Sequence, residues 1–151
     1  SFRNKCDTCT VEEDLNWLRD YLYIMNLRFE NRFTVDIRMD PGLIQTRIPR
    51  SIFQPVLENT IVHGFEDMDA GGKILLEGRI ENDGFRVFRI KDNGSGFEPG
   101  RVEADLNVEA DGVGLSNLNH RLQILYKGRY TLKIHTAIGR GTEVIIRLPP
   151  Q

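Results

Sequence analysis

Gln54–Gly64, which reads QPVLENTIVHG, is the first of four stretches whose order decides the fold. It is followed by DNGSGF at 92–97, GVGL at 112–115 and GRGT at 139–142. A single glycine pair usually marks only a turn. Three glycine-rich turns, interleaved with an Asp and with a helix that carries an Asn, are much harder to obtain by chance. We therefore interpret the four stretches as parts of one site.

The spacing of apolar residues predicts the elements around these stretches. Thr10 and Glu13 form a capping pair that is typical of a helix start, so we expect a leading amphipathic helix over 10–32. Pro49 suits a first helical turn, and the next helix is expected from Pro55 to Phe65 with a kink near Gln54. A third helix is predicted at 115–126, and strands are predicted at 33–39, 73–81, 85–91, 130–136 and 142–148.

This element order predicts the fold class. Hairpins with helices on one face form an α+β two-layer sandwich, whereas a doubly wound parallel sheet would need helices between the later strands. The polar stretch from Glu98 to Asp111 reads as a loop.

Composition limits the classes of function. The chain has 151 residues, 40% of them hydrophobic, which fits one domain with a core. A net charge of −2 provides no basic surplus for a phosphate backbone, so nucleic acid is not expected as a partner. No apolar run reaches the roughly 18 residues that span a bilayer, and the N-terminus lacks a signal peptide. Because the chain starts at Ser1, we expect residues 1–9 to be the remnant of an upstream linker.

Several other chemistries lack their sequence signals. Cys6 and Cys9 have metal-site spacing, but without a second pair they are better interpreted as two free thiols. The nucleophile elbow of hydrolases, the Walker A motif and the signatures of eukaryotic-type protein kinases are all missing from the sequence.

Asp92 carries the clearest chemical signal. Its carboxylate, at the end of a predicted strand, can accept a hydrogen bond from the exocyclic amine of adenine, whereas guanine presents a carbonyl there. Thr142 offers a hydroxyl to the same base. The alternatives are an Asx turn at Asp92 and a plain hairpin turn before Thr142.

The glycines and the Asn-bearing helix complete the predicted pocket. Gly94 and Gly96 would allow close backbone approach to the base and ribose. Gly112 and Gly114 precede a helix whose first amides suit phosphate oxygens, although both could serve only the turn. The side-chain oxygen of Asn59 is a hard ligand that suits Mg²⁺.

Three further side chains are candidates with structural alternatives. Glu58 could orient a metal-bound water or be a solvated helix residue. His63 could contact phosphate, although a lone helical His is more often structural. Arg121 could neutralise phosphate or form a surface salt bridge.

The pattern resembles the nucleotide-binding domain that sensor histidine kinases share with DNA gyrase B, Hsp90 and MutL. Residues 48–64 look like the Asn box of the YesM/LytS-like branch of sensor kinases, and 92–97, 112–122 and 139–142 look like its glycine boxes. The leading helix, with Glu13-Asp14-Leu15, Tyr21-Leu22 and Leu27-Arg28-Phe29, is also similar to that branch.

The resemblance implies a Bergerat-type fold with a mixed sheet of about five strands under about three helices. It implies an ATP-binding catalytic domain over 33–151 with an ATP lid at about 97–111. Asn59 would hold Mg²⁺ and, with Glu58, serve catalysis. The ATP-binding residues would be Asn59, His63, Asp92, Gly94, Gly96, Gly112, Gly114, Leu115, Arg121 and Thr142.

By the same resemblance, the γ-phosphoryl group of ATP goes to a histidine on an upstream dimerisation helix of the homodimeric kinase and then to a response regulator. The domain would lie on the cytoplasmic side of a membrane-anchored bacterial sensor. Two departures are visible. Val62 stands where the branch usually has a basic residue, so one phosphate cation is missing or is supplied elsewhere, for example by Arg101. No segment matches the phosphoacceptor box, so the chain should bind ATP without phosphorylating itself.

Two rival functions share these features. One is a degenerate module that retains the nucleotide or only the fold and docks to partners, which Val62 favours. The other is an anti-sigma-type serine kinase, against which the leading helix argues.

Overall fold

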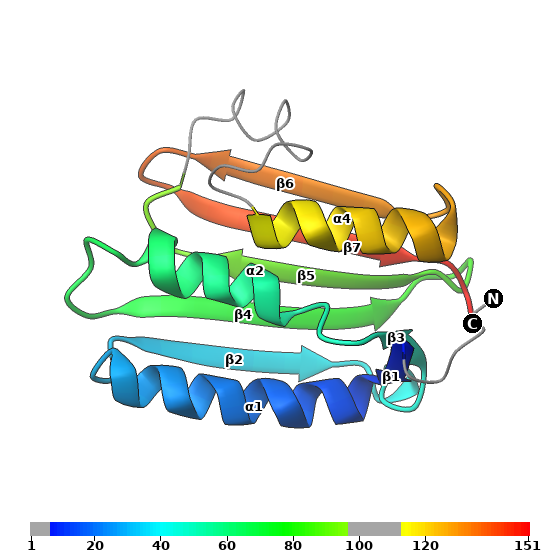
Figure 1. Cartoon of the computed structure of the whole chain (residues 1–151), viewed down its shortest axis with the longest axis horizontal. Coiled ribbons are helices and arrows are strands. Elements are labelled where there is room, and N and C mark those ends of the chain that lie inside the picture. Colours follow the sequence, from blue (N-terminus) through cyan, green and yellow to red (C-terminus); the bar gives the residue numbers. More distant parts are fainter. Residues whose placement is uncertain (1–6, 97–112) are drawn as a thin grey trace.

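A computed structural model describes residues 7–96 and 113–151. In this part of the chain, three α-helices cover one face of a five-stranded sheet (Figure 1). The helices are α1 (Val11–Arg28), α2 (Gln54–Asn59) and α4 (Val113–Tyr126). The strands of the sheet are β2 (Phe33–Met39), β4 (Gly72–Ile80), β5 (Arg86–Asp92), β6 (Thr131–Ala137) and β7 (Gly141–Leu148). The predicted α+β two-layer sandwich is confirmed.

The sheet is mixed, in the order β2-β4-β5-β7-β6. β2 runs parallel to β4, and the other three pairings are antiparallel. The predicted hairpins β4–β5 and β6–β7 both form. β5 is therefore the central strand. Its last residue, Asp92, lies at the end of the strand, next to the turns that contain Gly94 and Gly141.

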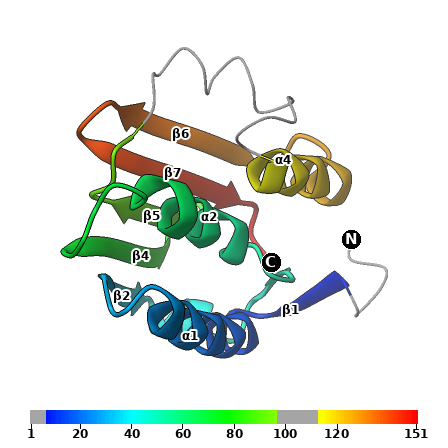
Figure 2. The ribbon, with the colours of Figure 1, turned by 60° about the vertical axis from the view of Figure 1, so that its left-hand side comes forward.

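The core lies between the sheet and the helix layer (Figure 2). Alternation along β4 sends Ile74 and Leu76 into it, at 2% and 0% exposure. Helix α1 adds the predicted stripe, of which Leu15, Leu18, Leu22 and Met25 are buried. No helix among the described residues is both long enough and apolar enough to cross a membrane.

Helix α1 begins as predicted and ends earlier. Thr10 accepts a hydrogen bond from the Glu13 amide at 3.1 Å, and the Glu13 carboxylate accepts one from the Thr10 amide at 3.1 Å. The helix ends at Arg28, because Glu30 and Asn31 take positive φ angles of 55° and 57°. Residues 29–32 therefore form a turn before β2.

The expected helical turn at Pro49 is wrong. Pro49 ends β3 (Arg47–Pro49), which pairs antiparallel with β1 (Thr8–Thr10) in a separate two-stranded sheet. A short 3₁₀ helix, η2 (Pro41–Leu43), precedes β3. Three-residue strands have too few alternating positions to leave a local signal, so only the tertiary pairing reveals them.

The helix of the first stretch also differs in detail. Pro55 lies in the first turn of α2, where no helical hydrogen bond is lost, so the helix begins at Gln54 instead of being kinked there. It continues into a π-helical turn, η3 (Thr60–Gly64), which the Phe65 amide closes by donating to the Thr60 carbonyl at 2.9 Å. π turns are rare and often lie at functional sites.

Candidate functional site

Asp92 lies at the centre of the candidate site. Its side chain is buried at 7% exposure and accepts three hydrogen bonds. The Thr60 hydroxyl donates to Oδ2 at 2.7 Å. The amides of Gly94 and Thr142 donate to Oδ1 at 2.8 and 3.2 Å. One carboxylate thus joins the Asn-bearing helix to the first and third glycine stretches.

The turn after Asp92 fits tightly between two other segments. The Ser95 amide donates to the Gly64 carbonyl at 2.9 Å. A Cβ atom at Gly94 would lie 2.6 Å from that carbonyl oxygen, and one at Gly96 would collide with the Ala137 carbonyl. Gly96 also has a φ of 69°, which side chains other than glycine rarely adopt. Both glycines are therefore required by packing, whatever else they do.

Asn59 is half-buried and ends α2 next to Thr60. Pro55, one helical turn earlier on the same face, contacts the start of α4, because a Cβ atom at Gly114 would lie 3.3 Å from Pro55 Cβ. Asn59 thus lies on the side of α2 that faces the N-terminus of α4, and its neighbour Thr60 binds Asp92. The structure brings the segments of Asn59, Asp92 and Gly114 together.

The beginning of α4 provides the amides expected near phosphate. Gly114 is exposed, and Leu115 beside it is buried at 6% exposure. Unpaired N–H groups at the N-terminus of a helix of 14 residues attract anions. Gly112, the predicted ATP lid at about 97–111 and Arg101 lie outside the described residues.

The remaining candidates are more dispersed. His63 is exposed on η3, and Glu58 is exposed on α2. Burial raises the pKa of Tyr21 on α1 to about 12, and the charge of Glu58 adds to this effect, so Glu58 lies toward α1. Thr142 is half-buried, and its Oγ1 lies 3.0 Å from that of Thr136.

Arg121 has a structural partner. Its Nη2 donates to the carbonyl oxygen of Arg50, in the segment between β3 and α2. The residue lies two turns beyond Gly114, roughly 10 Å along the helix axis. Its contact with phosphate stays a prediction.

The sequence reasoning missed Thr60 altogether. Its hydroxyl anchors the Asp92 carboxylate, and the residue is only 6% exposed. A signal was available, because Thr60 is a polar residue beside Leu57 and Ile61 on the apolar side of a helix. Such a position needs a buried hydrogen-bond partner.

Cys9 is an unreactive, buried thiol. It is fully buried in β1 as a free thiol, and burial together with the nearby charge of Asp14 raises its pKa to about 12. A thiol with such a pKa is a poor nucleophile and metal ligand at neutral pH. The prediction of a free thiol is confirmed for Cys9, whereas Cys6 lies outside the described residues.

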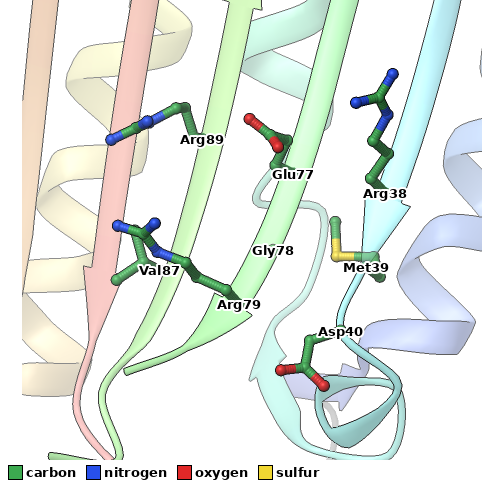
Figure 3. Close-up of a pocket in the computed structure, with 8 residues that line it drawn as sticks. All are labelled: Arg38, Met39, Asp40, Glu77, Gly78, Arg79, Val87 and Arg89. Atoms are coloured by element: carbon green, nitrogen blue, oxygen red, sulfur yellow. The ribbon is translucent and has the colours of Figure 1, made fainter. Parts of the chain in front are cut away.

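A pocket of about 400 Å³ lies on the face of the sheet away from the helices. Figure 3 shows its side chains in front of β2, β4 and β5, with the helices behind the sheet. Arg38 and Arg89 line it but point away from each other (Figure 3). None of the predicted site residues lines this pocket.

Residues 45–151, more than half of the chain, match the family model described as histidine kinase-, DNA gyrase B- and HSP90-like ATPase. The sensor histidine kinase YesM of Bacillus subtilis is 28% identical over 149 residues, which cover 99% of this chain and 25% of that protein. The sensor histidine kinase YpdA of Escherichia coli is 30% identical over 146 residues, which cover 93% and 24%. The chain therefore spans about a quarter of the length of these relatives.

Solved structures share the fold. The histidine kinase domain of a blue-light activated kinase from Erythrobacter litoralis aligns with a TM-score of 0.65 and 20% identity, over 89% of this chain and 59% of that one. The catalytic domain of the histidine kinase ThkA aligns with a TM-score of 0.61 and 16% identity, over 90% and 92% of the two chains.

Proposed function

Because the chain belongs to the family of histidine kinase-, DNA gyrase B- and HSP90-like ATPases, we propose that it is the ATP-binding catalytic domain of a two-component sensor histidine kinase. In the intact protein it transfers the γ-phosphoryl group of ATP to a histidine outside this chain, on a dimerisation helix of the kinase. The phosphoryl group then passes to a response regulator. The domain works on the cytoplasmic side of a membrane-anchored sensor.

The observation that carries this proposal is the setting of Asp92. An ionised carboxylate offers about four acceptor positions, and within residues 7–96 and 113–151 three donors occupy Asp92. One position remains for the exocyclic amine of adenine. Guanine would place a carbonyl oxygen against the carboxylate, so the site prefers ATP.

The side-chain oxygen of Asn59 is the one protein ligand that the proposal assigns to Mg²⁺. Among the described residues, no three His, Cys, Asp or Glu side chains cluster as metal ligands. A metal at Asn59 would therefore rely on phosphate oxygens and waters besides the amide oxygen, which is how Mg²⁺ usually binds with nucleotides. When bound, Mg²⁺ supplies charge neutralisation on the phosphates. Asn59 and the first amides of α4 contribute by positioning them.

A partner-docking module without kinase activity is the second candidate. Val62 is 36% exposed at the position where the kinase branch has a basic residue, which removes one cation from the phosphate end. In that case the nucleotide would bind without help from the metal. An anti-sigma-type serine kinase is disfavoured by α1, whose sequence follows the sensor-kinase branch.

Calorimetry of ATP binding separates these functions. We expect the chain to bind ATP in Mg²⁺ and at least tenfold more weakly in EDTA. Asn59→Ala should remove most of that magnesium dependence, because it deletes the metal-binding oxygen. Asn82→Ala, an exposed Asn in the β4–β5 turn, is the matched control and should bind like the wild type. Binding that ignores both Mg²⁺ and Asn59 would favour the docking module.

A further inference from the structure

The four residues between β3 and α2, Arg50 to Phe53, lead directly into the helix that carries Asn59. We call them the 50–53 loop. Wherever this loop lies, the first turn of α2 must follow. The contacts of the loop therefore influence the position of Asn59.

Helix α1 holds this loop through Asp14. The Ser51 amide donates to Oδ1 of Asp14 at 2.7 Å, and the Asp14 side chain is only 3% exposed. Ser51 has a φ of 55°, a left-handed conformation that residues other than glycine seldom adopt without local support. The guanidinium of Arg50 stacks over Trp17 of α1, 5.0 Å from the ring centre. Two neighbouring loop residues are thus held by α1.

Helix α4 holds the same loop from another direction. Arg121 donates to the carbonyl oxygen of Arg50, the residue before Ser51. The N-terminus of α4 contacts Pro55 just beyond the loop. The 50–53 loop therefore contacts both α1 and α4 and leads directly into α2.

Burying the Asp14 carboxylate costs free energy, because the charged form is removed from water. Its Oδ2 is buried and has no hydrogen-bond partner in the described part of the chain. Burial raises the pKa of Asp14, although the Ser51 amide, the Cys9 thiol, the Ile52 amide and the Arg121 charge oppose this effect. The Ile52 amide therefore lies near the carboxylate without meeting the geometry of a hydrogen bond to Oδ2. A well-packed apolar side chain often stabilises such a site at least as well as a buried charge. Stability is therefore a weak reason for an acidic residue at this position.

We infer that Asp14 is a positioning residue for the nucleotide site, because its bond to the Ser51 amide fixes α2, and with it Asn59, relative to α1. The inference rests on the proposed function, which assigns Asn59 to the nucleotide-bound metal. A shift of α1 along its axis would reach Asn59 through this contact. The leading helix is then part of the machinery that sets magnesium–nucleotide affinity.

Two measurements on Asp14→Ala test the inference. In the nucleotide-free chain, hydrogen exchange followed by mass spectrometry should become faster in peptides covering residues 50–59. In calorimetry, the Kd for Mg-ATP should rise about tenfold, whereas binding in EDTA should change little. The same Asp14→Ala change in an Asn59→Ala background should have almost no further effect, because both changes act on one metal contact.

Three variants serve as controls. Asp14→Asn keeps an oxygen that can accept from Ser51 and should restore slow exchange and affinity to within about threefold. Asp20→Ala changes an exposed acidic residue of the same helix and should resemble the wild type. Asp14→Val fills the space and removes the acceptor, so it replaces Asp14→Ala if that variant does not fold.

Unchanged exchange at 50–59, or additive losses in the Asp14 and Asn59 double variant, would overturn the inference. An equal loss in EDTA and in Mg²⁺ would also overturn it, because a merely structural role would weaken both. If the wild-type chain bound no nucleotide, both the proposed function and the role of Asn59 in holding the metal would be wrong. The exchange measurement would then still decide whether Asp14 holds the loop.

Discussion

At Asp92, the two oxygens of one carboxylate have different partners. Among the residues that the structure describes, Oδ1 accepts hydrogen bonds from two backbone amides, whereas Oδ2 accepts one from the Thr60 hydroxyl alone. A hydroxyl can also accept a hydrogen bond, so an amide NH₂ in place of Oδ2 would still be satisfied by Thr60. The same NH₂ would meet the adenine amine donor to donor. Asp92→Asn therefore separates the structural bonds from base recognition.

We predict that Asp92→Asn weakens Mg-ATP binding by roughly ten- to a hundredfold, which corresponds to a loss of about 1.4–2.8 kcal/mol. The preference for ATP over GTP should fall as well, because an NH₂ group can donate to the guanine carbonyl. Calorimetry with both nucleotides measures the two effects, and Asp20→Asn on α1 is the control. An Asn variant that retained the full ATP preference would contradict adenine recognition by Asp92.

Asp14 gives a prediction about pH. Burial raises its pKa above the ordinary 3.8, so folding favours the protonated form. The stability from this group is therefore fully present below about pH 4 and is lost as the pH rises through the raised pKa. The groups that face it are the Cys9 thiol and the cation of Arg121.

In urea unfolding at several pH values, the free energy of the wild type minus that of Asp14→Asn should become smaller as the pH rises from 4 to 7. The subtraction removes the opposite effect of carboxylates such as Glu13, whose pKa is lowered by the Thr10 amide and hydroxyl. A difference that grew with pH would show that the ion is stabilised in the fold.

At the scale of elements, consecutive residues of β4 point to opposite faces of the sheet, one covered by the helices and one not. Leu76 is fully buried beneath the helix layer, whereas Leu75 is half-buried on the other face of the sheet. Leu76→Ala should lower the free energy of unfolding by about 2–5 kcal/mol, because it leaves a cavity. Leu75→Ala should cost clearly less. Urea unfolding of both variants tests this assignment of faces, and equal losses would contradict it.

The elements also show what a local pattern can reveal. The β4–β5 hairpin was predictable because Asn82-Asp83-Gly84 separates two apolar runs. The pairing of Cys9 in β1 with Ile48 in β3 was not, because it joins segments far apart in sequence. Arg86 was missed for the same reason. It is buried at 3% exposure and donates to the carbonyls of Arg47 and Pro149, which no periodicity reveals.

For the whole molecule, the order of the four stretches predicted the architecture better than the details of the site. The turns at Gly94 and Gly141 meet around Asp92, as a shared site requires. Thr60 and the Asp14–Ser51 contact remained hidden because each depends on a partner more than thirty residues away. The roles of Asn59, His63 and Arg121 in nucleotide binding remain predictions.

The chain as it stands is expected to bind ATP without phosphorylating itself. His63, His120 and His135 are all exposed, yet none lies in a sequence that resembles the phosphoacceptor box. Incubation with γ-labelled Mg-ATP should leave the chain unlabelled, while calorimetry on the same sample shows binding. Acid-labile label on one of these histidines would contradict the prediction.

Asp92 also bears on how descendants of this chain would change. Its carboxylate accepts hydrogen bonds from a π turn, a glycine turn and a hairpin. Asp92→Ala would therefore leave these three donors without their acceptor even in a protein that binds no nucleotide. A lineage that abandoned ATP would thus be under pressure to keep this aspartate, while Asn59 would be free to drift. In such a lineage, Asn59 is the more informative marker of retained activity.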